Sequence, residues 1–347
     1  MEKAVNAHTI IREAAGEFAL DAREICAVVG GFSGAGVWRV RDQSGGEFAI
    51  RKLQVTSTEE TVRQTEICEW MALACSEEVA AVPQPIRCIS QSSWQLQNSA
   101  GFWMAETWLP GFACRDTPGD SVLRNAACLV KSIHAAGRRY AELANRAGQF
   151  LQCRRGPSPA VRRRLSLIRQ LTRGSLAQLQ GRLVHEPDPR IRAEAEVLLR
   201  HLPTVLEDTA KTLQQLANQH WELQPVLRDL WYPHVLLQGD AVTGIVDWQA
   251  AAVDHCVVDA ARLLRSWCGP DALKFADAVK VFSSEWGLGA GETRLLTAID
   301  RASVMLSPLT WLQGRYRGLR LQDPHAVASE RLYDLLVTAV ACCRDIC

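Results

Sequence analysis

The sequence predicts an α+β protein in which a small antiparallel sheet precedes a larger, mainly helical part. Short apolar runs separated by glycine- and aspartate-containing turns fill roughly the first third of the chain, as expected for strands. From Ser121 onward, apolar residues recur at the spacing of three and four that is typical of one helix face. The 347 residues are enough for two domains, which we expect at 1–110 and 111–347.

Composition narrows the class of protein. Hydrophobic residues make up 48% of the chain and charged residues 22%, as in ordinary globular proteins. The formal net charge of +1 gives no reason to expect nucleic acid or a membrane surface as a partner. No apolar run approaches the ~18 residues that span a bilayer, and residues 1–20 lack an apolar signal core. We therefore expect a cytoplasmic protein, and the sequence leaves its oligomeric state open.

The amino-terminal part is expected to hold five strands and one helix. Residues 58–74 have helical periodicity, with acidic residues in the first turn. The expected strands are Ile25–Val29, Val37–Val40, Glu47–Leu53, Ile86–Ile89 and Phe102–Thr107. A glycine-rich turn between the first two strands includes Gly31, Ser33, Gly34 and Gly36. Such a turn lets backbone N–H groups approach phosphate oxygens, although many glycine-rich hairpins bind nothing.

The stretch from Val226 to Trp248 combines two acidic residues with a predicted hairpin. Asp229 precedes two short apolar runs, which turn residues separate at 238–241, and Asp247 follows the second run. A hairpin fixes the distance between its ends, so one carboxylate could lie near a reacting hydroxyl and the other on a metal ion. A lone aspartate in a loop usually caps a turn, but two around one hairpin favour a functional site.

This stretch resembles the catalytic and metal-binding loops of the aminoglycoside phosphotransferase and choline kinase-like family, which has a protein-kinase-like bilobal fold. The family pattern is H-G-D-L-x-x-x-N, a hairpin, and then I-D-W or I-D-F. Here Leu227, Arg228 and His234 replace the usual His, Gly and Asn, whereas Ile245–Trp248 matches. The resemblance extends from about Val29 to Leu264 and includes the V-P-x-P segment at 82–85.

The resemblance implies specific roles for the residues of the hairpin. Asp229 would accept or orient the acceptor hydroxyl, and Asp247 would hold Mg²⁺. His234 takes the place of the second metal ligand; imidazole suits Mn²⁺ or Zn²⁺ better than Mg²⁺, and a hydrogen bond to a phosphate or metal-bound water is the alternative. Arg228 and Asp259 would support the catalytic loop.

The resemblance also implies an ATP site. Arg51 on the third strand would contact the phosphates and pair with Glu66, with Glu69 as the alternative partner; Lys52 should point to the opposite face. The segment 104–111, which contains Glu106 and Trp108, resembles the hinge whose backbone groups hydrogen-bond adenine. A plain linker between the lobes is the structural alternative.

The expected activity is ATP-dependent phosphoryl transfer to a hydroxyl of a small molecule, with the helices between 187 and 219 as the place for the acceptor. The alternative is a pseudokinase that binds a nucleotide or a partner without catalysis, which the replacements Leu227 and His234 favour. Residues 153–173 contain seven arginines, which form either a solvated helix face or an anion-binding surface. Trp311 is expected in the core rather than at the acceptor pocket.

Overall fold

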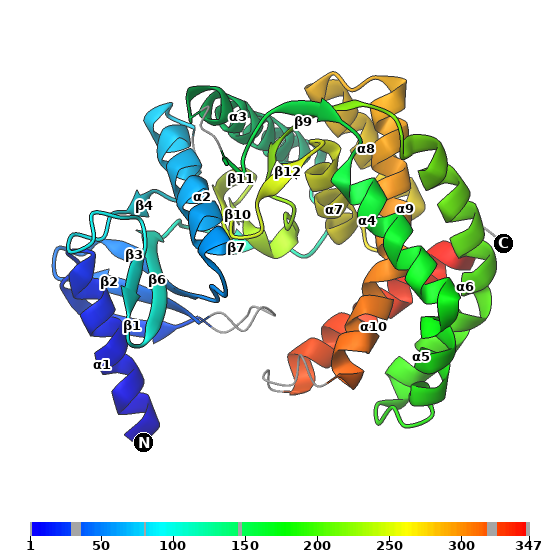
Figure 1. The fold of residues 1–347 in the computed structure, drawn as a ribbon, viewed down its shortest axis with the longest axis horizontal. Helices are drawn as coiled ribbons and strands as arrows, with labels where there is room; N and C mark the ends of the chain where they lie inside the picture. The colour runs from blue at the N-terminus through cyan, green and yellow to red at the C-terminus, as the bar shows by residue number, and fades with distance from the viewer. Residues whose placement is uncertain (1, 29–35, 80, 145–147, 318–324, 345–347) are drawn as a thin grey trace.

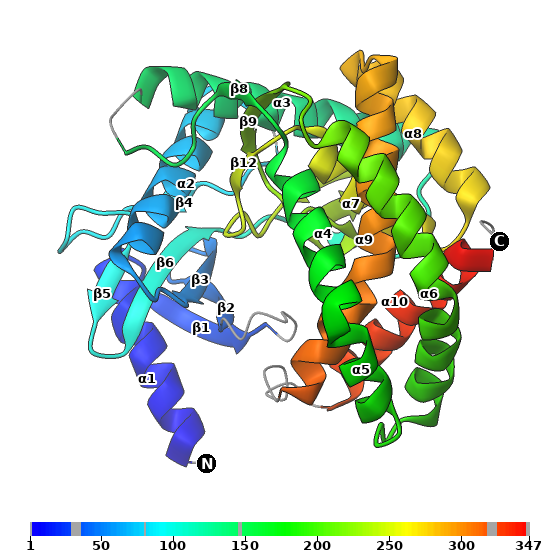
Figure 2. The ribbon, with the colours of Figure 1, turned by 45° about the vertical axis from the view of Figure 1, so that its right-hand side comes forward.

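The computed structural model describes residues 2–28, 36–79, 81–144, 148–317 and 325–344. Figures 1 and 2 show an antiparallel sheet with its helix α1 at one end of the molecule and a mainly helical part at the other. The hairpin β10–β11 lies between them (Figure 1). The α+β, kinase-like bilobal fold expected from the sequence is therefore confirmed.

The amino-terminal sheet has the strand order β1-β2-β3-β6-β4, and β5 pairs with β6. All of these pairs are antiparallel. The sequence predicted five strands, and the structure adds the short β5. The strands are β1 (Ala22–Ala27), β2 (Val37–Asp42), β3 (Glu47–Leu53), β4 (Pro85–Ile86), β5 (Leu96–Asn98) and β6 (Gly101–Thr107).

Helix α1 (Glu2–Glu17) is a second helix in this part of the chain, where only one was expected. Its buried residues Ile11, Ala14 and Ala15, followed by Phe18, share a hydrophobic cluster with Trp103 and other residues of the sheet. The apolar face is short and lies among charged residues, so the sequence pattern did not predict this helix. Its burial gives the sheet a core of its own.

Helix α2 (Thr58–Ser76) begins as the sequence predicted, with the Ser57 hydroxyl accepting a hydrogen bond from the Glu60 N–H. Although α2 precedes the strands β4–β6 in sequence, its apolar residues Trp70 and Met71 belong to the large core of the helical part. The Trp70 ring also packs edge-on against Trp248, with centroids 4.8 Å apart. Helix α2 therefore connects the two parts of the molecule.

Helices make up most of the carboxyl-terminal part, and their apolar faces form the large core. A five-residue π-helical segment (Leu171–Ser175) joins the fourth helix to the fifth, and Gly174 within it has a φ of 128°. No helix in the described ranges has the length and apolarity needed to cross a bilayer. The helices are α3 (Asp120–Ala144), α4 (Pro159–Gln170), α5 (Leu176–Leu183), α6 (Pro189–Leu216), α7 (Val257–Cys268), α8 (Ala272–Trp286), α9 (Ala290–Tyr316) and α10 (His325–Arg344).

Two small sheets support the loops of this part. Strands β10 (Val235–Gln238) and β11 (Ala241–Ile245) form the predicted hairpin, and β10 also pairs with β7 (Phe112–Ala113). In the other sheet, β9 (Trp221–Val226) lies between β8 (Arg154–Gly156) and β12 (Ala252–Asp254). The end of β9 leads into the Asp229 loop, and a short 3₁₀ turn (Tyr232–His234) leads into β10. The sheets thus fix both ends of the loop.

Candidate functional site

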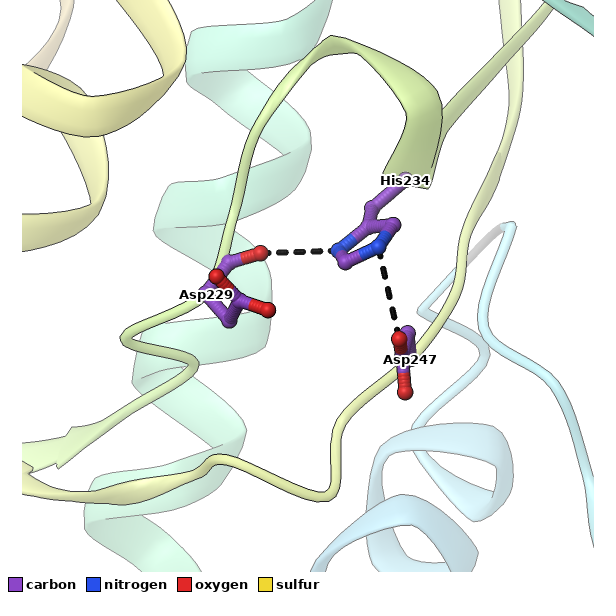
Figure 3. Close-up of side chains that lie close together, drawn as sticks. All are labelled: Asp229, His234 and Asp247. Atoms are coloured by element: carbon purple, nitrogen blue, oxygen red, sulfur yellow. Dashed lines mark hydrogen bonds and ion pairs between the residues drawn. The ribbon is translucent and has the colours of Figure 1, made fainter. Parts of the chain in front are cut away.

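The hairpin brings Asp229, His234 and Asp247 together. Nitrogen and carboxylate oxygen atoms of the three side chains lie within 4.8 Å of one another. The Val246 N–H donates to the His234 carbonyl at 3.0 Å, which joins the chain before β10 to the chain after β11. Figure 3 shows the imidazole between the Asp229 backbone carbonyl and the Asp247 side chain. The arrangement predicted from the hairpin, two acids facing one site, is present.

The backbone of this site is strained at two positions. Arg228 has a φ of 64° and Asp247 a φ of 66°, in the left-handed region that residues other than glycine rarely adopt. The Asp229 N–H donates to the Leu227 carbonyl at 2.8 Å, which closes a tight γ-turn around Arg228. Such conformations cost about 1–3 kcal/mol each and persist only when their surroundings hold them.

Asp259, at the start of α7, holds the Asp229 loop. Its fully buried carboxylate accepts hydrogen bonds from the N–H groups of Leu227 at 2.8 Å and Arg228 at 2.6 Å. These are the contacts that a supporting role requires. His134 on α3 completes the group, because its Nε2 lies 2.8 Å from the Asp259 carboxylate. The two residues are 125 positions apart in the chain, so no local pattern indicates this pair.

His234 has a defined tautomer in this arrangement. Its Nδ1 lies 2.7 Å from the Asp229 carbonyl oxygen, which can only accept, so Nδ1 carries the proton. The Trp231 indole N–H donates to Nε2 at 3.1 Å, which requires a lone pair there. Burial lowers the His234 pKa, although the Asp247 and Asp229 charges act in the opposite direction. The ring is therefore neutral.

The neutral imidazole lies next to a carboxylate, which makes a donor set for a cation. Nε2 of His234 is 3.3 Å from Oδ2 of Asp247, and neither atom carries a proton to donate to the other. Two acceptor atoms at this separation suit a divalent metal ion between them, which would take the Nε2 lone pair over from the Trp231 N–H. The chemistry of the described residues therefore fits a metal site made of one imidazole nitrogen and carboxylate oxygens.

Arg51 forms ion pairs that the sequence analysis did not expect. Its Nε lies 2.9 Å from the Glu106 carboxylate and its Nη1 lies 3.4 Å from Asp247. Ala49 pairs with Glu106 and Arg51 with Met104 in the β3–β6 ladder, so Arg51 and Glu106 are diagonal neighbours on one face. Lys52 points to the opposite face, as predicted, with its ammonium 5.4 Å from the Trp103 ring.

The expected pairing of Arg51 with Glu66 is wrong. Glu66 is fully buried, and its carboxylate accepts hydrogen bonds from the N–H groups of Phe150 and Leu151, the shortest at 2.8 Å. Glu69, the alternative partner, accepts a hydrogen bond from the Tyr140 hydroxyl at 2.7 Å. Both glutamates connect α2 to the helical part, because the face of α2 that bears them packs against α3 and the segment that follows it.

The expected hinge and glycine loop are described in part. The N–H groups of Thr107 and Trp108 donate to the carbonyls of Gln84 and Glu47 at 2.9 Å each, so these two donors are occupied. The Gly36 carbonyl accepts from the Lys52 N–H at 2.8 Å, and the Trp38 ring fills the space of a Cβ at Gly36. The other predicted members of the loop, Gly31, Ser33 and Gly34, lie outside the described residues.

A cavity of about 1360 Å³ extends from this site in two directions. One end is mostly apolar and lies between the sheet and the hairpin, where Ala49, Leu236 and Val246 line it along with Arg51 and Glu106. The other end lies among helices α7, α9 and α10. Its described lining includes Trp231, Tyr232, Arg262, Trp311, Arg331 and Tyr333.

The second end of the cavity differs from the sequence-based expectation. It involves α9 and α10 rather than residues 187–219, and Trp311 lines it instead of lying wholly in the core. None of the arginines at 154–173 lines the described cavity. Arg164, for example, donates to the Ser303 hydroxyl at 2.6 Å. Arg262, which no motif indicated, forms an ion pair with the Asp229 carboxylate.

Comparisons with known proteins agree with the fold described above. A model of the phosphotransferase enzyme family matches residues 24–296. The comparison with curated protein sequences returned no match. Among solved structures, the spectinomycin phosphotransferase bound to ADP and spectinomycin superposes with a TM-score of 0.68 and 11% identity, covering 96% of this chain and 97% of that one.

Two further structures show the same fold. An aminoglycoside phosphotransferase from Alicyclobacillus acidocaldarius gives a TM-score of 0.61 at 13% identity, with 96% of this chain and 93% of that chain covered. An amicoumacin kinase in complex with AMP-PNP, Ca²⁺ and Ami gives 0.62 at 12% identity, with 98% and 96% covered. At such low identity these likenesses establish the fold alone.

Proposed function

Because the chain belongs to the phosphotransferase enzyme family, we propose that it transfers the γ-phosphoryl group of ATP to a hydroxyl group of a small molecule. The observation that carries this proposal is the grouping of Asp229, His234 and Asp247 beside Arg51 at the junction of the two ends of one cavity. Phosphoryl transfer depends mainly on positioning and on neutralisation of charge, and these residues supply both.

The nucleotide would occupy the end of the cavity between the sheet and the hairpin. Ala49 above and Leu236 and Val246 below offer apolar surfaces for a base. Arg51 lies where the triphosphate would extend toward Asp247, and its guanidinium can contact phosphate oxygens in a forked geometry. The ADP-bound and AMP-PNP-bound relatives of the same fold support a nucleotide here.

Asp229 would orient the acceptor hydroxyl and accept its proton. Its carboxylate lines the cavity where the two ends meet, and the γ-turn held by Asp259 fixes its backbone. In the described structure this carboxylate forms an ion pair with Arg262. An ionised carboxylate is the form that a general base needs.

Asp247 and His234 would hold a divalent cation, Mg²⁺ or Mn²⁺, which when bound would neutralise charge on the phosphate oxygens. The neutral tautomer of His234 supports this assignment, because the Nε2 lone pair lies beside the Asp247 carboxylate, where a cation would replace the Trp231 N–H as its partner. The nitrogen donor favours Mn²⁺ relative to a site made of oxygen atoms only.

The proposal is tested by ADP release from ATP over a panel of hydroxylated compounds with Mg²⁺ or Mn²⁺ present. Asp229→Asn should reduce turnover by about 10²–10⁴-fold, the usual contribution of a general base. Asp240→Asn is the matched control, because Asp240 lies exposed in the turn of the same hairpin. Nucleotide binding without turnover for any acceptor would instead identify the protein as a pseudokinase.

A further inference from the structure

Among the described residues, one cation at the acceptor end of the cavity pairs with no carboxylate. Six lysine and arginine side chains line the described cavity, and five of them form ion pairs with carboxylates. The pairs join Arg51 to Glu106 and Asp247, Arg115 to Asp334, Arg262 to Asp229, Arg265 to Asp300 and Lys274 to Asp271. The sixth cation is Arg331 on α10. Among the described residues it has neither an ion pair nor a hydrogen-bonding partner.

Arg331 is held in place by an aromatic ring. Its guanidinium lies over the Trp231 ring, 4.4 Å from the centroid. Trp231 in turn donates its indole N–H to His234, so one residue contacts both Arg331 and the candidate metal ligand. A group bound at Arg331 therefore lies across a single side chain from the reaction centre. This position suits a part of the acceptor other than the reacting hydroxyl.

The surroundings make an unpaired charge at Arg331 costly. Burial, with repulsion from Arg262, lowers the pKa of Arg331 to about 10. Arg115 adds a second positive charge on the same side. Tyr232 and Asp334 act in the opposite direction and the Trp231 ring covers one face, but a desolvated guanidinium among other cations is stabilised most strongly by an anion that reaches it. Asp334, the carboxylate that acts on Arg331, is already paired with Arg115, so an anion on a bound molecule would compensate the Arg331 charge.

We propose that the acceptor carries an anionic group, a carboxylate or a phosphate, and that Arg331 binds it beside Trp231. This inference rests on the proposed phosphoryl transfer, because it specifies the acceptor of that reaction. It makes Arg331 a specificity-determining residue that acts through binding rather than chemistry.

The opposite preference, for a cationic acceptor such as an amino sugar, would require a carboxylate available to an amine. Asp116 is the candidate, because it lines the cavity and forms no ion pair with any described residue. Asp116 is exposed to solvent, however, and a hydrated carboxylate needs no partner. The half-buried Arg331 is the charge that a ligand must compensate, which favours an anionic acceptor.

The test compares four probes that share one sugar scaffold: glucose, glucosamine, glucuronate and glucose 6-phosphate. Inorganic sulfate is a fifth probe, which tests an anion without the sugar. Binding is measured by ligand-observed NMR and calorimetry on the full chain, with AMP-PNP and Mn²⁺ at saturation so that the phosphate positions of the nucleotide are filled. AMP-PNP binding is measured separately, so that a failure of the nucleotide site is distinguished from a failure of this proposal.

Glucuronate or glucose 6-phosphate should bind at least tenfold more tightly than glucose, and Arg331→Gln should abolish the difference. Which of the two binds better distinguishes a carboxylate from a phosphate. Arg87→Gln is the matched control, since Arg87 lies over the Trp94 ring at 4.1 Å and does not line the described cavity. Stronger binding of glucosamine, or the absence of any Arg331-dependent binding by sulfate and both anionic sugars, overturns the proposal.

Discussion

Arg51 on β3 lies 3.4 Å from the Asp247 carboxylate that follows β11, so a cation of the sheet is paired directly with an acid of the hairpin. The two residues are 196 positions apart in the chain. Arg51 also binds Glu106, which makes it the centre of a small charged network in which the guanidinium and Glu106 are nearly buried. This network lies beside the candidate metal site, so its integrity affects both stability and nucleotide binding.

Replacement of Arg51 should therefore have two separable effects. Arg51→Met leaves the Glu106 carboxylate buried without a partner, and we expect a loss of about 3–5 kcal/mol in the free energy of unfolding. The double variant Arg51→Met/Glu106→Gln should recover most of that stability but not ATP affinity. Urea denaturation and AMP-PNP titration measure the two effects. Lys52→Met, on the opposite face, is the control and should leave AMP-PNP affinity unchanged.

Glu66 should be important for stability and not for nucleotide binding. In Glu66→Gln, one acceptor oxygen is replaced by an NH₂ group that faces the Phe150 and Leu151 N–H donors, which costs about 1–3 kcal/mol. AMP-PNP affinity should stay within twofold of the unsubstituted chain. Glu59→Gln, at an exposed position in the first turn of the same helix, should be nearly neutral in the same unfolding experiment. A large loss of nucleotide affinity in Glu66→Gln would instead indicate that Glu66 pairs with Arg51 when the nucleotide is bound.

Asp259 should act on turnover through the Asp229 loop. Asp259→Asn weakens the acceptors for the Leu227 and Arg228 N–H groups, so the strained φ at Arg228 can relax and Asp229 moves. We expect kcat to fall at least tenfold while KM for ATP changes little. Asp271→Asn is the control, because Asp271 caps α8 by accepting from the Lys274 N–H and asparagine caps as well as aspartate. If kcat fell and KM for ATP rose by similar factors, the substitution would have destabilised the protein in general instead.

His234 should set the metal preference. His234→Asn replaces a nitrogen donor with an amide oxygen, and oxygen atoms suit Mg²⁺ better than nitrogen does. The ratio of Mn²⁺ to Mg²⁺ affinity should therefore fall at least tenfold, as measured by Mn²⁺ electron paramagnetic resonance with Mg²⁺ in competition. His185→Asn, at an exposed position away from the described cavity, should leave the ratio unchanged. An unaltered ratio in His234→Asn would mean that the imidazole binds a phosphate or a water molecule.

The sequence was sufficient for the parts of the fold that depend on local pattern. The hairpin β10–β11 follows from two apolar runs around a glycine-containing turn, and α2 follows from its periodicity and acidic first turn. The same locality explains why Asp229, His234 and Asp247 could be grouped. They lie within one short stretch of the chain, and the hairpin fixes the distance between the residues at its two ends. The resemblance of this stretch to a known family then indicated the fold of the whole chain.

The remaining site residues depend on contacts between distant segments. The Glu106 carboxylate reaches Arg51 because β6 pairs with β3, and the strand order of the sheet is not encoded in either strand. Arg331 likewise reaches Trp231 only through the packing of α10, the last described helix. Helix α1 was missed for a different reason, since its small apolar face lies between charged residues and has little periodicity.

The packing of α2 has a consequence for how the chain can be divided. The buried residues Trp70 and Met71 belong to the same core as the helices beyond residue 120, and the Glu66 carboxylate binds backbone groups at 150 and 151. A fragment that starts at residue 111 would lose this helix and expose the surface it covers, so autonomous folding of the carboxyl-terminal piece is not expected. We expect α2 to fold and unfold together with the carboxyl-terminal helices. A truncated protein that keeps this core intact therefore has to retain residues from 58 onward.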